Sequence, residues 1–104
     1  MKKIIIVSTN NTCRSFIAES VLRQYLKEAH QKDVEVVSRG LVVLFPEPVH
    51  VKAADMVRET GIEIVDFQSS QLLQEEVEES DLILTMTEEQ KEKVNRNPIV
   101  IPFV

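Results

Sequence analysis

The chain lacks the features that would tie it to a membrane or to a disulfide framework. Its single cysteine, Cys13, cannot form an internal disulfide, which fits a reducing cytoplasm. The longest apolar runs are too short to cross a bilayer, and the N-terminus has no secretory h-region or cleavage site. We therefore expect a cytoplasmic location and no membrane partner.

An excess of positive charge and a metal-ligand pattern are also missing. The 12 Lys and Arg residues against 17 Asp and Glu give a formal net charge of −5, which argues against a nucleic-acid partner. No group of His, Cys and carboxylate residues has metal-ligand spacing, so we expect neither a metal nor another cofactor. The remaining composition, 104 residues with 43% hydrophobic, predicts one globular domain over residues 1–104.

Apolar runs alternate with amphipathic segments along the chain. The expected strands cover residues 4–7, 34–37, 81–86 and 99–101. The expected helices cover residues 15–29, 51–59, 72–79 and a fourth stretch that Thr87 caps and Asn97-Pro98 ends. This alternation predicts the α/β class, with an open four-stranded parallel sheet and helices on both faces.

The first expected helix carries an apolar stripe. Ile17, Val21, Leu22 and Tyr25 recur at helical spacing, so these four side chains are expected to face the core. The second expected helix should end at Gly61, a typical C-terminal stop.

A short polar loop joins the first expected strand to the first expected helix. Residues 8 to 15 read Ser8, Thr9, Asn10, Asn11, Thr12, Cys13, Arg14 and Ser15. Backbone N–H groups in such a loop, together with a helix N-terminus, favour an anion at the carboxyl end of the strand. Arg14 adds a planar fork of donors that fits phosphate. The segment therefore predicts a loop that binds phosphate or a phosphoryl group.

Residues 8–22 resemble the low-molecular-weight protein tyrosine phosphatase family, whose loop reads Cys-x-Gly-Asn-x-Cys-Arg-Ser-Pro before a helix beginning near Ile-Ala-Glu. The matching positions are Asn11, Cys13, Arg14, Ser15, Ala18 and Glu19. Residues 37–40 are similar to the family's Ser-Ala-Gly segment, and residues 80–87 to its Ala-Asp-Leu-Val-Leu-x-Met segment. The resemblance covers nearly the whole chain and implies the family's fold, with the phosphate-binding loop after the first strand.

Four positions depart from the family pattern. Ser8 stands at the position of the nucleophilic cysteine, Asn10 at that of a glycine and Phe16 at that of a proline. Asn10 is a turn residue that tolerates a positive φ. Phe67 stands where many members have a histidine.

The resemblance implies a role for each loop residue. The family's thiolate attacks phosphorus, its arginine binds the equatorial oxygens, and an Asp-Pro loop protonates the leaving oxygen. This makes Ser8 and Arg14 the catalytic positions, with Asn11 and Ser15 holding the loop. A hydroxyl is far less acidic than a thiol, and Val104 falls about where the Asp-Pro loop would begin. We therefore expect a domain that binds phosphate or a phosphorylated protein side chain and whose catalysis is weak or absent.

Other interpretations stay open at this point. The chain could be an active protein tyrosine or arginine phosphatase that carries an engineered or unusual Ser8, or a phosphocarrier or protein-interaction module. Thr12 matches the arginine phosphatase branch of the family, so phosphoarginine is a candidate ligand. An apolar edge left by the family's missing C-terminal elements could be covered by self-association or by a partner.

Several single residues have ordinary structural interpretations. Cys13 is expected to be a buried structural thiol. His30 is expected to be solvated after a helix, and His50 to be structural at a helix start. Phe45 and Phe103 are expected in the core or at an edge, where either could also wall a shallow pocket.

Overall fold

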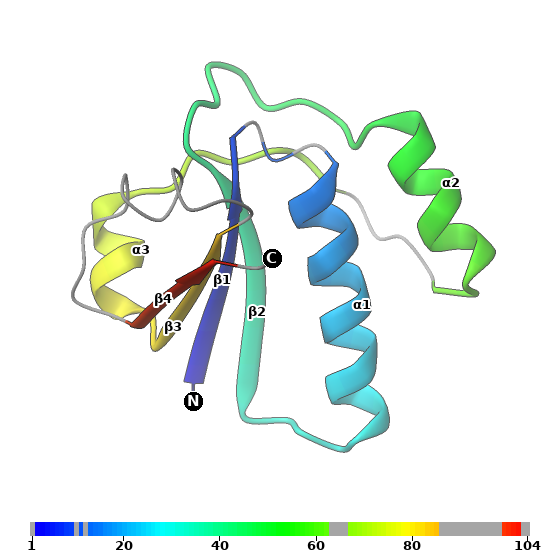
Figure 1. The fold of residues 1–104 in the computed structure, drawn as a ribbon, viewed down its shortest axis with the longest axis horizontal. Helices are drawn as coiled ribbons and strands as arrows, with labels where there is room; N and C mark the ends of the chain where they lie inside the picture. The colour runs from blue at the N-terminus through cyan, green and yellow to red at the C-terminus, as the bar shows by residue number, and fades with distance from the viewer. Residues whose placement is uncertain (1, 10, 12, 63–66, 86–98, 103–104) are drawn as a thin grey trace.

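The structure combines one sheet with helices, as Figure 1 shows. The structure, a computed structural model, describes residues 2–9, 11, 13–62, 67–85 and 99–102. The strands are β1 (Lys2–Ser8), β2 (Val34–Gly40), β3 (Leu82–Thr85) and β4 (Ile99–Pro102). The helices are α1 (Arg14–Glu28), α2 (Val51–Glu59) and α3 (Gln74–Glu79). The helix expected after residue 87 lies outside the described residues.

The sheet is parallel and has the order β2-β1-β3-β4. Ile5 of β1 lies opposite Val37 of β2 on one side and opposite Ile83 of β3 on the other. Parallel backbone pairing also joins β3 to β4. The expected α/β class with a parallel sheet and helices is confirmed.

Side chains of β1 alternate between the two faces of the sheet, since successive residues of a strand point to opposite sides. Ile5 and Val7 pack with Ile83 and with Val77 of α3. Ile6 lies on the opposite face, toward α1. Figure 1 accordingly shows α1 and α3 on opposite sides of the sheet. The continuous β-branched run of β1 is therefore explained by burial on both faces.

A second apolar cluster lies where α1 meets α2. Phe16, Ala53 and Val57 are its buried members, each at most 2% exposed. The ring of Phe67 packs edge-on against Phe16, with centroids 4.8 Å apart and planes at 65°. Gly61 follows α2 with a φ of +83°, a conformation that favours glycine, so the predicted helix stop is confirmed.

The buried side of α1 differs from the predicted one. Val21 and Tyr25 are 50% and 65% exposed, so their expected place in the core is wrong. The buried residues of this helix are Ser15, Phe16 and Glu19. The physical reason is that α1 turns its N-terminal half toward α2 and the end of β2, and part of the predicted stripe borders an open groove.

Two further expectations concern single aromatic residues. Phe45 is 72% exposed on the segment between β2 and α2, so its predicted place in the core is wrong. Phe103 lies outside the described residues.

Side chains of α1 cover the outer edge of β2. Arg23 donates from Nη2 to the Val36 carbonyl oxygen at 2.7 Å. The Ser38 N–H donates to Glu19 Oε1 at 2.8 Å, and Glu19 pairs with Arg23 at 3.5 Å. An uncovered edge strand offers free backbone groups to other chains, so these contacts protect the sheet as well as fixing α1.

One buried hydroxyl generates a stability prediction. Ser38 is 1% exposed, and its Oγ has no hydrogen-bond partner in the described part of the chain. Ser38→Ala removes this unsatisfied group, so the free energy of unfolding in urea should rise by about 1 kcal/mol. Ser80→Ala is the matched control, because the buried Ser80 hydroxyl donates to the Val77 carbonyl at 2.9 Å. It should lose about 1 kcal/mol, and equal losses in both variants would contradict the assignment.

Candidate functional site

The segment between β1 and α1 lies at the carboxyl end of the sheet. β1 ends at Ser8, which is 7% exposed, and α1 begins at Arg14. The segment after β2 bonds to the start of this loop. Leu41 N–H donates to the Ser8 carbonyl at 3.0 Å, and Val42 N–H donates to the Thr9 carbonyl at 2.8 Å. Residues that follow β2 therefore help to fix the loop that follows β1.

Three buried side chains form a hydrogen-bonded chain at the start of this loop. The Ser8 and Ser15 hydroxyl oxygens are 2.7 Å apart, and Ser15 Oγ donates to Asn11 Oδ1 at 2.8 Å. The Asn11 N–H donates back to Ser8 Oγ at 3.1 Å, which closes a ring of contacts. Ser15 and Asn11 are fully buried, so this arrangement is shielded from water.

The donor and the acceptor in each of these hydrogen bonds follow from counting the available protons. Asn11 Nδ2 donates to the Ser38 carbonyl at 3.3 Å, so Oδ1 is the amide atom that faces Ser15 and can only accept. Ser15 has one hydroxyl proton and uses it on Asn11. The Ser8 hydroxyl must then donate to Ser15, which leaves one Ser8 lone pair that no described residue takes.

Asn11 adopts the left-handed backbone conformation, with a φ of 59°. Asn tolerates this region better than most residues because its short polar side chain bonds locally. The positive φ was expected at Asn10, which lies outside the described residues together with Thr12. Among the described residues of this loop, the left-handed position is thus the residue whose side chain fixes the loop.

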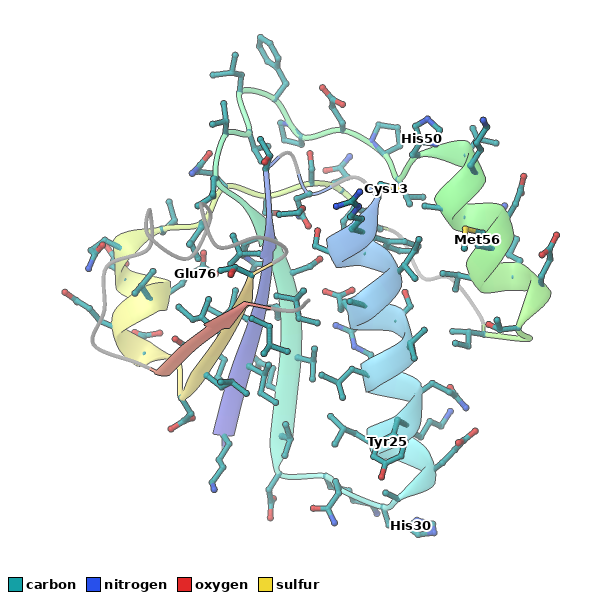
Figure 2. The ribbon with its side chains drawn as sticks, in the orientation of Figure 1. Cys13, Tyr25, His30, His50, Met56 and Glu76 are labelled. Carbon is teal, nitrogen blue, oxygen red and sulfur yellow. The ribbon has the colours of Figure 1, made fainter. Side chains whose placement is uncertain are left out.

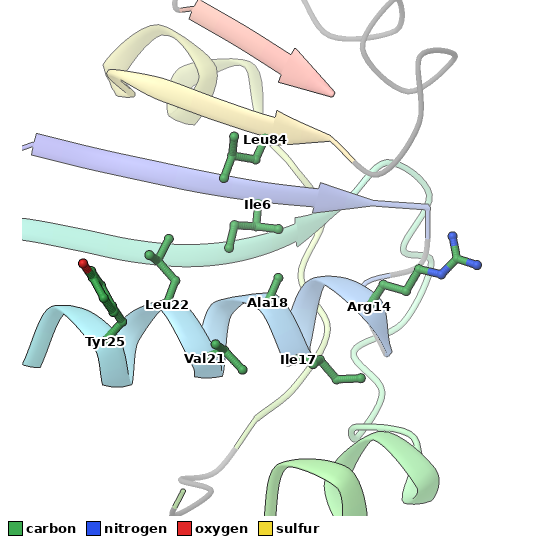
Figure 3. Close-up of a pocket in the computed structure, with 8 residues that line it drawn as sticks. All are labelled: Ile6, Arg14, Ile17, Ala18, Val21, Leu22, Tyr25 and Leu84. Carbon is green, nitrogen blue, oxygen red and sulfur yellow. The ribbon is translucent and has the colours of Figure 1, made fainter. Parts of the chain in front are cut away.

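Arg14 is exposed at the first position of α1. No hydrogen bond or ion pair joins it to another described residue. In Figure 3 its side chain extends past the carboxyl end of β1, at the sheet end where the loop lies. A 15-residue helix beginning here adds the partial positive charge of its N-terminus. An uncommitted guanidinium at this place can supply donors to an anion.

Cys13 is exposed, so the expected buried thiol is wrong. Figure 2 shows it at the N-terminal end of α1, far along the helix from Tyr25. It precedes the helix and provides no side-chain cap. The buried places at this helix end are taken by Ser15 and Phe16 instead.

Sequence reasoning missed the residues that support the loop from β2 and from the segment before α3. Gln71 accepts from Val43 N–H and donates to the Leu41 carbonyl, both at 2.8 Å. The Glu47 N–H donates to Ser69 Oγ at 2.8 Å. Ser38 supplies its carbonyl to Asn11, and only the similarity of residues 37–40 to the family segment pointed toward it.

A separate apolar groove of about 610 Å³ runs along α1. Figure 3 shows Ala18 and Leu22 on the helix facing Ile6 and Leu84 of the sheet, with Arg14 and Tyr25 at opposite ends. Between Arg14 and Tyr25 its walls are aliphatic, so the middle of the groove does not suit a phosphate group. The described features that suit an anion lie at the loop.

Metal ligands and membrane spans can be assessed for the described residues alone. Among them, no group of three His, Cys, Asp or Glu side chains could hold a metal ion. Nor is any helix in these segments long and apolar enough to cross a bilayer. His30 is exposed after α1, and the exposed His50 caps α2 by accepting from Lys52 N–H at 3.2 Å.

Known proteins with similar sequences are phosphatases. The profile of the family described as low molecular weight phosphotyrosine protein phosphatase matches residues 3–100. EpsP of Ralstonia nicotianae, a probable low molecular weight protein-tyrosine-phosphatase, is 34% identical over 99 residues, covering 94% of this chain and 65% of EpsP. Etp of Escherichia coli K12, a low molecular weight protein-tyrosine-phosphatase, is 35% identical over 83% of this chain and 55% of Etp. The chain thus spans less than two thirds of these relatives' length.

A solved structure adds an arginine phosphatase to these relatives. It is a cysteine-to-serine mutant of the YwlE arginine phosphatase with a phosphorylated active-site serine. It superimposes with a TM-score of 0.80 at 34% identity, over 86% of this chain and 58% of that one. With the profile covering most of the sequence and EpsP above 30% identity over nearly all of it, the chain belongs to the low molecular weight phosphotyrosine protein phosphatase family.

Proposed function

We propose that this chain binds phosphate or a phosphorylated protein side chain in the loop from Ser8 to Ser15, and that its catalysis is weak or absent. Its family binds phosphorylated substrates. The observation that carries the proposal is the buried ring of Ser8, Asn11 and Ser15 beside the exposed Arg14, at the N-terminus of α1. A helix dipole and a guanidinium at the same end of the sheet support anion binding there.

Impaired turnover is proposed because Ser8 occupies the nucleophile position. A helix N-terminus and a neighbouring cation can bring a cysteine thiol to a pKa near or below neutrality, but a serine hydroxyl starts far less acidic. The described groups that contact Ser8 Oγ are the Asn11 N–H and the Ser15 hydroxyl, and neither is a base. Activation by a general base, which a serine nucleophile needs, has no support from these contacts.

The ligand class within this function is also a proposal. Thr12 fits the arginine phosphatase branch, and the YwlE mutant, at 34% identity, supports phosphoarginine as a ligand beside phosphotyrosine. That mutant also supports the idea that a serine at this position leaves the loop able to receive a phosphoryl group. We further propose a cytoplasmic site of action, where the exposed thiol of Cys13 would stay reduced.

Removal of the guanidinium tests the binding site. Arg14→Ala should weaken phosphate binding roughly tenfold or more, since a hydrogen bond to a charged group contributes about 1.5–3 kcal/mol. The measurement is a titration of phosphate, phosphotyrosine and phosphoarginine, followed by the amide NMR signals of residues 8–15. Arg58→Ala is the control, because Arg58 is an exposed arginine on α2 whose ion pair lies within that helix. If millimolar ligand moves none of these loop signals in the unmodified chain, binding at this loop is excluded.

Restoring a thiol tests why turnover is impaired. If the hydroxyl alone limits catalysis, Ser8→Cys should hydrolyse an activated aryl phosphate with many turnovers per chain, because the thiolate is the better nucleophile. Continued inactivity of a folded Ser8→Cys variant that still binds phosphate would instead support a binding protein that has lost more than its nucleophile. Fast multiple turnover by the unmodified chain would contradict the proposal.

A further inference from the structure

The described residues leave the apolar stripe of α1 partly uncovered. Val21 and Tyr25 are 50% and 65% exposed, and Ile17 is half-buried because it also packs against the cluster between α1 and α2. These three residues are spaced by four, so their side chains form one ridge along the helix. The ridge borders the apolar groove along α1, as Figure 3 shows. Apolar surface of this kind is typical of a contact with another molecule.

Charged residues of opposite sign lie at the two ends of this ridge. Arg14 precedes Val21 by seven residues and Glu28 follows it by seven, so all three lie on one face of the helix. Both charged side chains are exposed, and within the described part of the chain neither forms an ion pair. Glu28 accepts one hydrogen bond from Gln24, at 3.1 Å. The face is therefore positive at one end, apolar in the middle and negative at the other.

We propose that this face of α1 is the contact between two copies of the chain, with the two helices antiparallel. A two-fold axis beside Val21 places that residue against its own copy and places Ile17 of each copy against Tyr25 of the other. The same axis places Arg14 of each copy opposite Glu28 of the other, so the interface holds this ion pair twice. The face is thus complementary to itself in both charge and apolar surface, which favours a second copy as its partner.

The charges decide the direction in which the two helices run. In a parallel pair Arg14 would face its own copy, and so would Glu28, which is repulsive at both ends. In the antiparallel pair each of these residues lies about 10 Å along the axis from Val21. A shallow crossing of about 20° keeps the ends of the helices close, and this crossing is the one that a spacing of seven residues favours.

The size of the face limits the strength of the pairing. Helix α1 has 15 residues and is therefore about 22 Å long. A stable interface of standard size buries about 800 Å² on each partner, and one face of a single helix offers less than that. We therefore expect reversible pairing with a dissociation constant between about 10 μM and about 1 mM. Because the pairing is weak, Arg14 of the free chain remains available to an anion at the loop.

The oligomeric state of the full chain tests the inference. Sedimentation velocity across this concentration range should show a reversible equilibrium between monomer and dimer. Val21→Glu should weaken the pairing roughly tenfold or more, because two carboxylates then meet at the two-fold axis. Val51→Glu is the matched control, since Val51 is a 71% exposed valine on α2, and it should pair like the unmodified chain. Circular dichroism confirms that both variants are folded.

Reversal of one charge tests the ion pairs. Glu28→Lys should raise the dissociation constant roughly three- to tenfold, because both symmetric pairs become repulsive. Glu59→Lys, which makes the same change of net charge at an exposed residue of α2, should leave the constant unchanged. Added salt should weaken the pairing of the unmodified chain and strengthen that of Glu28→Lys.

Disulfide crosslinking tests the direction and the register. In a Cys13→Ser background, Val21→Cys should give a covalent dimer on oxidation, because residue 21 lies beside its own copy. Tyr25→Cys should not, because its own copy is about 12 Å away along the axis and a disulfide spans at most about 7 Å between Cα atoms. Crosslinking of Tyr25→Cys as fast as that of Val21→Cys would overturn the antiparallel register.

The remaining outcomes decide the inference without reference to phosphate binding. A chain that stays monomeric up to about 1 mM would overturn it. A dimer that Val21→Glu and Val51→Glu weaken equally, or not at all, would show that another face makes the contact. Loss of phosphate-induced shifts in the loop amides would remove the proposed function and leave the pairing of α1 intact.

Discussion

The geometry of the loop depends on Asn11. Its backbone N–H donates to Ser8, its side chain accepts from Ser15, and its amide nitrogen donates to the Ser38 carbonyl. These groups are buried, so a lost partner leaves an unsatisfied polar atom at a cost of about 1–3 kcal/mol. One residue in a left-handed conformation thereby joins β1, α1 and β2 at the carboxyl end of the sheet.

The helix that follows the loop is fixed by a second set of contacts. Glu19 and Arg23 bind the outer backbone edge of β2, while Phe16 packs edge-on against Phe67. The family resemblance implies a proline at the position of Phe16 and a histidine at that of Phe67, and in this chain the two rings contact each other. An edge-to-face pair contributes about 0.5–1.5 kcal/mol beyond its buried area.

The loop from Ser8 to Ser15 would act differently on a hydroxyl and on a thiolate at residue 8. Backbone donors and a guanidinium stabilise a phosphate whichever atom lies beneath it. A thiolate has no proton and can only accept hydrogen bonds, whereas the Ser8 hydroxyl also donates one, here to Ser15 Oγ.

From the sequence alone, the strands and helices of the described residues could be predicted, and a binding loop could be proposed. The β-branched run before residue 8 has its best burial in a parallel sheet, and the segment from Ser8 to Ser15 is recognisable because strand, donor-rich loop and helix follow each other in the chain. Segments 51–59 and 99–101 were also found close to their observed bounds.

Which side chains are buried, and which hydroxyl donates to which, became clear from the three-dimensional packing alone. Val21, Tyr25 and Cys13 are residue types that are often buried, yet they are exposed here. The reason is that the packing of α1 depends on where β2 and α2 lie. Gln71 and the Ser38 carbonyl support their loops across 28 or 27 residues of chain, a separation at which no local pattern predicts a contact. Local periodicity fixes elements and motifs, whereas burial and hydrogen-bond direction arise from neighbours that only folding brings together.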